Sequence, residues 1–311
     1  MKNQGWEFEL STVNINRNGF KWNTSFNFTT NRNKVLKLSG GENEEIYNVN
    51  SNALVTKPGE RIGFFRLAEY EGIHPEGGYE MIAEMDLDHF NATGERVRTG
   101  NAIPATRSNL EKHLFDFTEK SGLPTYFGGL NSTFIYNGFE LSAQLAFQGG
   151  NYIYDLAARG SSYVTVGQMR SGPLQNTWTP ENRDAAWPEL TWNKRYDVIN
   201  EDGTITENER FGNNRHGQVH DKFLQKGDYI RLRTLQLGYN FEPGTLERFN
   251  LKNARIFVSG TNLLTITGYD GYDPEVVQLE GGSENRNLAQ GWVGVQLPQL
   301  QSVNLGVNLS L

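Results

Sequence analysis

The sequence predicts an all-β fold: an antiparallel transmembrane β-barrel, of which this chain supplies only a part. Apolar and polar residues alternate along whole stretches such as 253–267 and 301–311, whereas strands of globular proteins usually have about five or six residues. A strand that crosses a bilayer at a tilt needs about nine to eleven. Short turns also alternate with long polar segments. These features predict roughly eight to ten strands of a larger barrel, with short periplasmic turns and long extracellular loops.

The N-terminal 31 residues predict a β-hairpin. Large apolar side chains alternate with polar ones over residues 5–15, and the phase slips near Thr12 and Val13, which predicts a β-bulge. Asn18-Gly19 is a strong signal for a two-residue hairpin turn. The alternation then resumes over residues 20–30.

The following segments are less regular. Residues 61–70 and 79–85 predict two further strands. Residues 31–60, 86–122 and 152–223 show no sustained periodicity and are predicted to be loops. Loops of this length are normal on the outer surface of membrane barrels.

Three clear strand units follow. Residues 124–148 predict a hairpin with an Asn137-Gly138 turn, and residues 228–241 and 253–267 predict a longer hairpin. Pro243 and Gly244 are predicted to open the turn of this longer hairpin. In its second strand one face is predicted to carry Ala254, Ile256, Val258, Gly260, Asn262, Leu264 and Ile266. In the last strand, residues 301–311, the predicted lipid-facing side chains are Val303, Leu305, Val307 and Leu309.

Composition excludes several classes of protein. The net charge is −7 with both signs mixed, so no nucleic-acid-binding surface is indicated. The absence of cysteine excludes disulfides and cysteine-based metal or nucleophile chemistry. No apolar run approaches the roughly 18 residues of a membrane helix, but the alternation of a barrel strand keeps its mean hydropathy low. The sequence contains no Walker loop, dinucleotide glycine motif or serine nucleophile elbow, and we expect no enzyme activity and no cofactor.

Several motifs resemble the SusC/RagA family of TonB-linked outer-membrane transporters. The most specific are LGYNF at 237–241, GTNL at 260–263 and GYDPEV at 271–276. The segments 126–141 and WTPEN at 178–182 are also similar to the family. In their shared order these motifs cover most of the chain.

The resemblance implies TonB-energised uptake of oligosaccharides or peptides across the outer membrane. It implies a SusD-like surface lipoprotein and the TonB complex as partners, a glycan or peptide as substrate, and contact with outer-membrane lipid. The family also has an N-terminal plug domain and a signal peptide, and neither is seen before Gly5. We therefore expect residues 1–311 to be the C-terminal part of such a barrel. The final residue, Leu311, departs from the aromatic residue that is usual in the family.

Three kinds of binding site were considered. Trp178, Trp187 and Trp192 lie in one polar region and are candidates for stacking against a substrate sugar, with loop packing as the alternative. Residues 200–209 resemble a calcium loop, but Val198 falls at the first ligand position, which favours an ordinary Asp-Gly turn. His216 and His220 have a helical spacing in a segment that reads as a loop, so a metal site is disfavoured.

Two other functions remain open at this stage. A soluble or surface β-sandwich that binds carbohydrate would explain the tryptophan-rich loops, and it predicts short strands. A glycoside hydrolase would need two carboxylates at a fixed separation. The sequence contains many carboxylates and gives no basis for choosing two of them.

Overall fold

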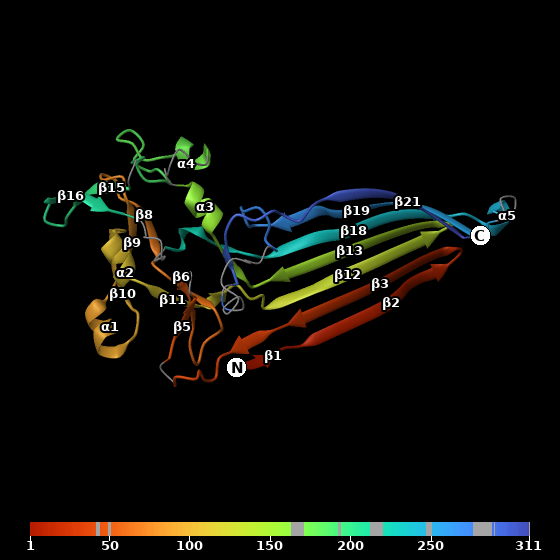
Figure 1. Cartoon of the computed structure of the whole chain (residues 1–311), viewed down its shortest axis with the longest axis horizontal. Coiled ribbons are helices and arrows are strands. Elements are labelled where there is room, and N and C mark those ends of the chain that lie inside the picture. The colour runs from red at the N-terminus through yellow and green to blue at the C-terminus, as the bar shows by residue number, and fades with distance from the viewer. Residues whose placement is uncertain are drawn as a thin grey trace.

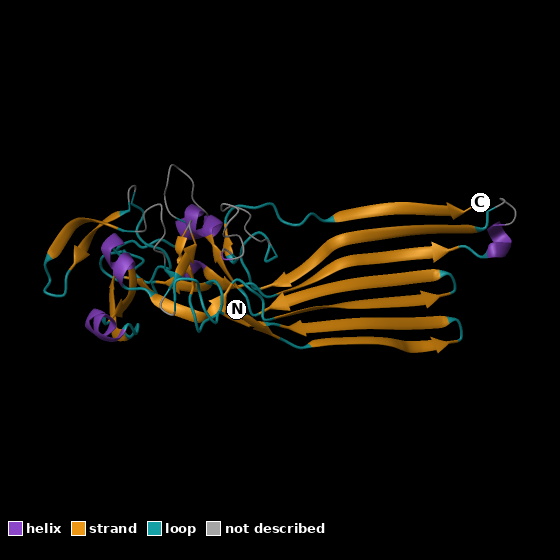
Figure 2. Cartoon of the chain, turned by 60° about the horizontal axis from the view of Figure 1, so that its bottom comes forward, coloured by secondary structure: helices purple, strands orange, loops and turns teal. Residues whose placement is uncertain are grey.

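A computed structural model describes residues 1–41, 44–48, 51–162, 171–191, 194–211, 220–246, 251–275, 288 and 290–310. The largest unit is one antiparallel sheet of seven long strands, which extends away from a group of small sheets and short helices (Figures 1 and 2). Its strands, in spatial order, are β2 (Glu7–Arg17), β3 (Phe20–Thr30), β12 (Tyr126–Tyr136), β13 (Phe139–Gly149), β18 (Tyr229–Asn240), β19 (Asn253–Thr267) and β21 (Ser302–Ser310).

The tight connections of this sheet lie at one end. Asn18 and Gly19 join β2 to β3, and Asn137 and Gly138 join β12 to β13. All four residues have positive φ, as a type I′ hairpin turn requires. Both predicted hairpin turns are therefore confirmed. The connection after β18 contains a short helix, α5 (Pro243–Leu246), where only a turn was predicted.

Two strands of the long sheet carry irregularities. In β2 the pairing with β3 shifts between Val13 and Ile15, so the predicted bulge is confirmed. A second bulge was not predicted. Leu145 and Gln144 of β13 face Leu232 and Thr234 of β18, which leaves Arg233 as an extra residue. Strand β19 has two residues at this level, 262 and 263, and Asn262 has a φ of 52°.

The other end of the sheet meets the group of small sheets (Figure 1). One has four strands, β5 (Ile46–Asn48), β6 (Ser51–Thr56), β7 (Phe64–Leu67) and β11 (Phe115–Ser121). Another has three, β8 (Tyr70–Ile73), β9 (Glu80–Met85) and β10 (Arg98–Pro104). A third joins β14 (Tyr152–Asp155), β17 (Leu224–Lys226) and β20 (Trp292–Val293). Two-stranded units are β1 (Lys2–Gln4) with β4 (Arg32–Lys34), and β15 (Arg195–Ile199) with β16 (Ile205–Arg210).

Five short helical segments complete the described chain. Besides α5, they are α1 (Leu87–Thr93), α2 (Arg107–Lys112), α3 (Leu156–Ser161), α4 (Ser171–Gln175) and a 3₁₀ turn at Asp221–Phe223. Side chains cap three of them, because Asp86, Thr106 and Asp155 each accept a hydrogen bond from a backbone N–H of the first turn. Among the residues that the structure describes, no helix is both long and apolar enough to cross a membrane.

Three segments that were predicted to be loops contain regular secondary structure, so these predictions are wrong in part. Residues 31–60 contain β4, β5 and β6, residues 86–122 contain two helices and two strands, and residues 152–223 contain β14, β15 and β16. The strands predicted at 61–70 and 79–85 are confirmed as β7 and β9, whereas β8, which begins at Tyr70, was not predicted. The hydrophobic core of the molecule lies in this group, where Leu54, Phe65 and Tyr154 are fully buried.

Candidate functional site

The long sheet has one apolar and one polar face. Residues that pair across neighbouring strands lie on the same face of a sheet. One row of paired residues crosses five neighbouring strands with an apolar side chain on each: Phe134, Leu141, Leu237, Val258 and Leu305. These side chains are not covered: Leu305 is 76% exposed, and Leu237 is 46% exposed. The four predicted lipid-facing residues of β21 all lie on this face. An apolar surface of this extent is unusual on a soluble monomer.

Aromatic residues gather at two levels of the apolar face. Near the tight turns, Trp22 stacks on Phe134 with ring centroids 5.4 Å apart, and Phe139 lies 4.7 Å from Tyr239. Toward the small sheets, the rings of Phe28, Tyr126 and Phe147 form a second cluster. Aliphatic and small residues lie between the two levels. Two aromatic girdles around an apolar band are typical of membrane barrels.

The middle of the polar face carries no charge. We call this surface the neutral belt. Among the described residues it consists of Ser25, Asn131, Thr133, Ser142, Gln144, Thr234, Gln236, Ser259, Thr261, Ser302 and Asn304. Charged residues of this face lie nearer the ends, for example the pair of Arg255 and Glu140 near the tight turns, at 2.8 Å.

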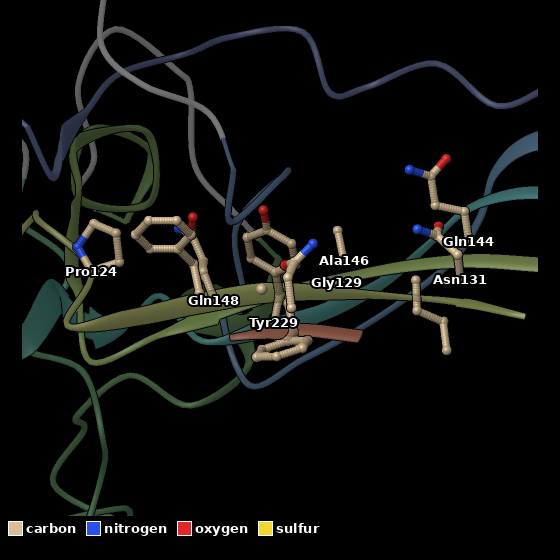
Figure 3. A pocket seen from close by; sticks show the side chains of 12 residues that line it. Pro124, Gly129, Asn131, Gln144, Ala146, Gln148 and Tyr229 are labelled. Atoms are coloured by element: carbon tan, nitrogen blue, oxygen red, sulfur yellow. The ribbon is translucent and has the colours of Figure 1, made fainter. Parts of the chain in front are cut away.

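Among the described residues, three adjoining hollows follow the polar face from the small sheets toward the tight turns. The middle hollow, of about 360 Å³, has Gly129 and Ala146 at its floor (Figure 3). Asn131 and Gln144 lie side by side at one end, and Gln148 lies at the other. The small side chains of the floor create the space, and the carboxamides around it offer both donors and acceptors.

The other two hollows adjoin the middle one. The upper hollow, of about 430 Å³, lies among the loops and shares Pro124 and Gln148 with the middle hollow. The lower hollow, of about 370 Å³, lies over β2 and β3 and shares Asn131 with it. The three volumes are within the range of small-ligand pockets.

Known proteins are similar to this chain in sequence and in fold. No protein-family model matches the chain. The TonB-dependent receptor P3 of Formosa agariphila is 27% identical over 99% of the chain, and the TonB-dependent receptor SusC of Bacteroides thetaiotaomicron is 23% identical over 89%. The chain is similar in sequence to TonB-dependent receptors, SusC among them. It spans 28% and 24% of the lengths of these two proteins.

A solved structure of similar fold agrees with this relationship. The structure of the RagAB peptide transporter superposes on the chain with a TM-score of 0.72 at 21% identity, covering 99% of this chain and 29% of that one. The resemblance to the SusC/RagA family and the fold class inferred from the sequence are thereby confirmed.

An ionic cluster ties residues 268–275 to the polar face of the long sheet. We call it the loop anchor; it consists of Arg231, Arg233, Asp273 and Glu275. Arg231 lies 2.5 Å from Asp273 and 2.8 Å from Glu275, and Arg233 also pairs with Glu275. Burial alone would raise the pKa of Asp273, but hydrogen bonds from Arg231 and from the backbone N–H of Gln299 lower this pKa below its usual range. The anchor joins two arginines of β18 to the family-like motif at 271–276.

The predicted sugar-stacking tryptophans lie in the loop group. Trp178 is 8% exposed, and its indole N–H donates to the carbonyl of Pro75 at 3.0 Å. Its backbone N–H also donates to the carbonyl of Trp187 at 2.9 Å, so these two residues are neighbours. The ammonium of Lys222 lies 4.0 Å from the centre of the Trp187 ring. Trp192 lies outside the described residues. A role of these rings in substrate binding stays a prediction.

The remaining candidate sites have ordinary structural roles. The calcium-like segment forms the β15–β16 hairpin, in which Asp202 Oδ1 accepts from the backbone N–H of Thr204 at 2.9 Å. No group of carboxylates and histidines suited to a metal ion occurs among the described residues. His220 lies 3.2 Å from Glu80 in the core, and its predicted companion His216 is outside the described part.

Sequence reasoning missed the hollows and the loop anchor. The hollows depend on which residues face one another across neighbouring strands, and these strands are far apart in the sequence. The anchor joins residues 42 and 44 positions apart. Its signal in the sequence is limited to two arginines in one predicted strand and two carboxylates in the family-like motif at 271–276.

Proposed function

We propose that the natural gene product is an outer-membrane transporter that imports oligosaccharides or peptides with energy from the TonB complex. This chain would supply the C-terminal part of its barrel wall. A SusD-like surface lipoprotein is proposed as the partner at the loop end. One observation carries the proposal: a seven-stranded antiparallel sheet has an exposed apolar face with two aromatic clusters and an opposite face that is polar.

The two faces fit a barrel wall between lipid and water. The apolar face would contact hydrocarbon, and the neutral belt would line the lumen. The turns at Asn18-Gly19 and Asn137-Gly138 would lie in the periplasm because barrel turns are short there, and the group of small sheets would lie outside the cell. The outermost strands, β2 and β21, would pair with the rest of the barrel, since open sheet edges are not tolerated in lipid.

A soluble carbohydrate-binding sandwich is a weaker candidate. Such a fold would bury its apolar face against a second sheet. Here the apolar residues of β21 remain exposed, with Val303 at 70%.

Cell fractionation and uptake test the proposal together. The gene product is expected in the outer-membrane fraction, resistant to carbonate and soluble in detergent. A strain without the gene should lose uptake of a fluorescent oligosaccharide or peptide, and a protonophore should abolish that uptake in the parent strain. A gene product found in the soluble fraction, or uptake unaffected by the deletion, would contradict the proposal.

A further inference from the structure

We infer that three cations at the loop end of the apolar face bind the phosphate groups of an outer-leaflet lipid. They are Lys2, Arg32 and Lys34, and we call them the basic rim. They lie on the two-stranded ribbon of β1 and β4, and Figure 1 shows β1 in line with β2. The inference rests on the proposed outer-membrane location, and it adds to that function a lipid site outside the transport path.

The pairing register places the basic rim on the apolar side of the sheet. Lys2 pairs with Lys34 in the same register that pairs Phe8 with Phe28 on the apolar face. Successive side chains of a strand alternate between the two faces, and these positions are an even number of residues apart along each strand. Arg32 lies on this side for the same reason.

The contacts of the ribbon agree with this orientation. Asn33 is 9% exposed, and its Oδ1 accepts from the backbone N–H of Ile62 at 2.8 Å, whereas both of its neighbours in β4 are exposed. Between the ribbon and the long sheet, the backbone N–H of Thr30 donates to the carbonyl of Trp6 at 2.8 Å. The ladder therefore continues from the sheet into the ribbon, and the basic rim points away from the group of small sheets.

The outward side changes from apolar to aromatic to basic toward the loop end. Trp6 is 83% exposed and lies between Phe8 and the basic rim. An exposed indole beside an apolar band is typical of the interface between a membrane and water. Arg32 lies four residues beyond Phe28, which is about 13 Å along a strand. This order places the basic rim at the level of the lipid headgroups, where long cationic side chains meet phosphates.

The charges of the basic rim are not compensated by the protein. Within the described part of the chain, no carboxylate lies within ion-pair distance of these three cations. Lys2 and Lys34 also face each other directly, and like charges in this arrangement destabilise a sheet. A phosphate between the two ammonium groups would replace their repulsion by charge-assisted hydrogen bonds.

A fourth cation adds to the positive charge at this place. The guanidinium of Arg61 donates to the backbone carbonyls of Glu119 and Leu123, each at 3.0 Å. Burial lowers the pKa of Arg61, and the positive charge of Arg32 also lowers it, whereas Glu119 raises it. The two guanidinium groups are therefore close enough to repel each other. Such a group attracts an anion, and its position beside the apolar face favours a lipid phosphate over a free one.

Lipid binding to the natural gene product, purified from outer membranes in detergent, tests the basic rim. The probes are diphosphorylated lipid A and the same lipid with both phosphates removed, with inorganic phosphate as a competitor. Native mass spectrometry counts the bound lipid during each titration. The double variant Arg32→Gln with Lys34→Gln removes two charges from the rim. The matched control, Arg17→Gln with Lys252→Gln, removes the same charges from exposed residues at the tight-turn end.

A second variant separates lipid binding from folding. Lys2→Glu places opposite charges across the pair with Lys34, so the thermal stability of the protein should stay the same or rise. The same change brings a carboxylate to the place of the phosphate. Binding of diphosphorylated lipid A should therefore fall although the fold is intact.

We expect diphosphorylated lipid A to bind at least tenfold more tightly than the lipid without phosphates. The double variant and Lys2→Glu should each weaken this binding at least fivefold, and the control should change it less than twofold. Equal affinity for the two lipids, unchanged affinity in the rim variants, equal losses in the rim and control variants, or displacement of the lipid by millimolar inorganic phosphate would overturn the inference. The proposed function fails separately, by the loss of membrane location or of gene-dependent uptake.

Discussion

Leu305 and Asn304 are neighbours in β21 that point to opposite faces of the sheet. Asn304 pairs with Ser259 on the polar side, and Leu305 pairs with Val258 on the apolar side. Replacing Leu305 by arginine should cost about 2–4 kcal/mol if the position lies near the bilayer midplane, because the charge would enter hydrocarbon. Arginine at Asn304 should cost much less, since that side chain would face water. Urea unfolding in lipid vesicles measures both, and equal costs would refute the assignment of the two faces.

Trp22 and Ser132 form a polar contact on the apolar face of the sheet. The indole N–H of Trp22 donates to the hydroxyl of Ser132 at 2.9 Å. Hydrocarbon supplies no substitute for this bond, although measured couplings between polar side chains in membranes are modest. A double-mutant cycle with Trp22→Phe and Ser132→Ala should give a coupling of about 0.6–1.7 kcal/mol. A coupling near zero in the same unfolding assay would show that water reaches the pair.

At the scale of elements, the loop anchor fixes residues 268–275 on β18 and β19. Arg231→Leu would leave Asp273 buried without its main partner, and removing one side of a buried ion pair costs about 3–5 kcal/mol. Hydrogen exchange over 268–275 should become faster. Arg233→Gln is the matched control, because Glu275 would keep Arg231. Unchanged protection in the Arg231 variant would show that the loop is held by other contacts.

The elements that the sequence predicts well are those that depend on local residues. The hairpins around Asn18-Gly19 and Asn137-Gly138 combine a turn signal with alternation on both sides, so strand type and register follow from adjacent residues. The strands of the loop group are short and pair over long distances. For example, Phe65 of β7 pairs with Phe117 of β11. No local pattern reports such a pairing, and the segment of β11 was predicted to be a loop.

The candidate site was predictable only in outline for the same reason. Alternation assigns Asn131 and Gln144 to the same side of their hairpin as other polar residues, but it does not indicate that Gly129 and Ala146 open a space between them. The tryptophans were chosen by residue type. Trp178 is largely buried, because its indole N–H finds a backbone acceptor in the core of the loop group.

At the scale of the whole molecule, the chain divides into two parts, the long sheet and the group of small sheets. The long sheet has exposed side chains on its apolar face, whereas the group of small sheets contains the buried core around Phe65 and Tyr154. Only the group of small sheets covers its own apolar surface, so only this part is suited to water on all sides. The exposed apolar face of the long sheet is the feature that favours a membrane barrel over the soluble sandwich considered from the sequence.

The extra residue Arg233 in β18 shifts the alternation of apolar and polar faces by one residue. Before Arg233 the apolar-face residues of β18 have even numbers, Ile230 and Leu232. After it they have odd numbers, Leu235 and Leu237. If Arg233 instead took a place in the regular alternation, every later side chain of β18 would turn to the opposite face, placing leucines on the polar side and Gln236 on the apolar side. An alignment with a relative that lacks the extra residue therefore needs a gap at this position, because without the gap the apolar-face and polar-face positions would be exchanged along half a strand.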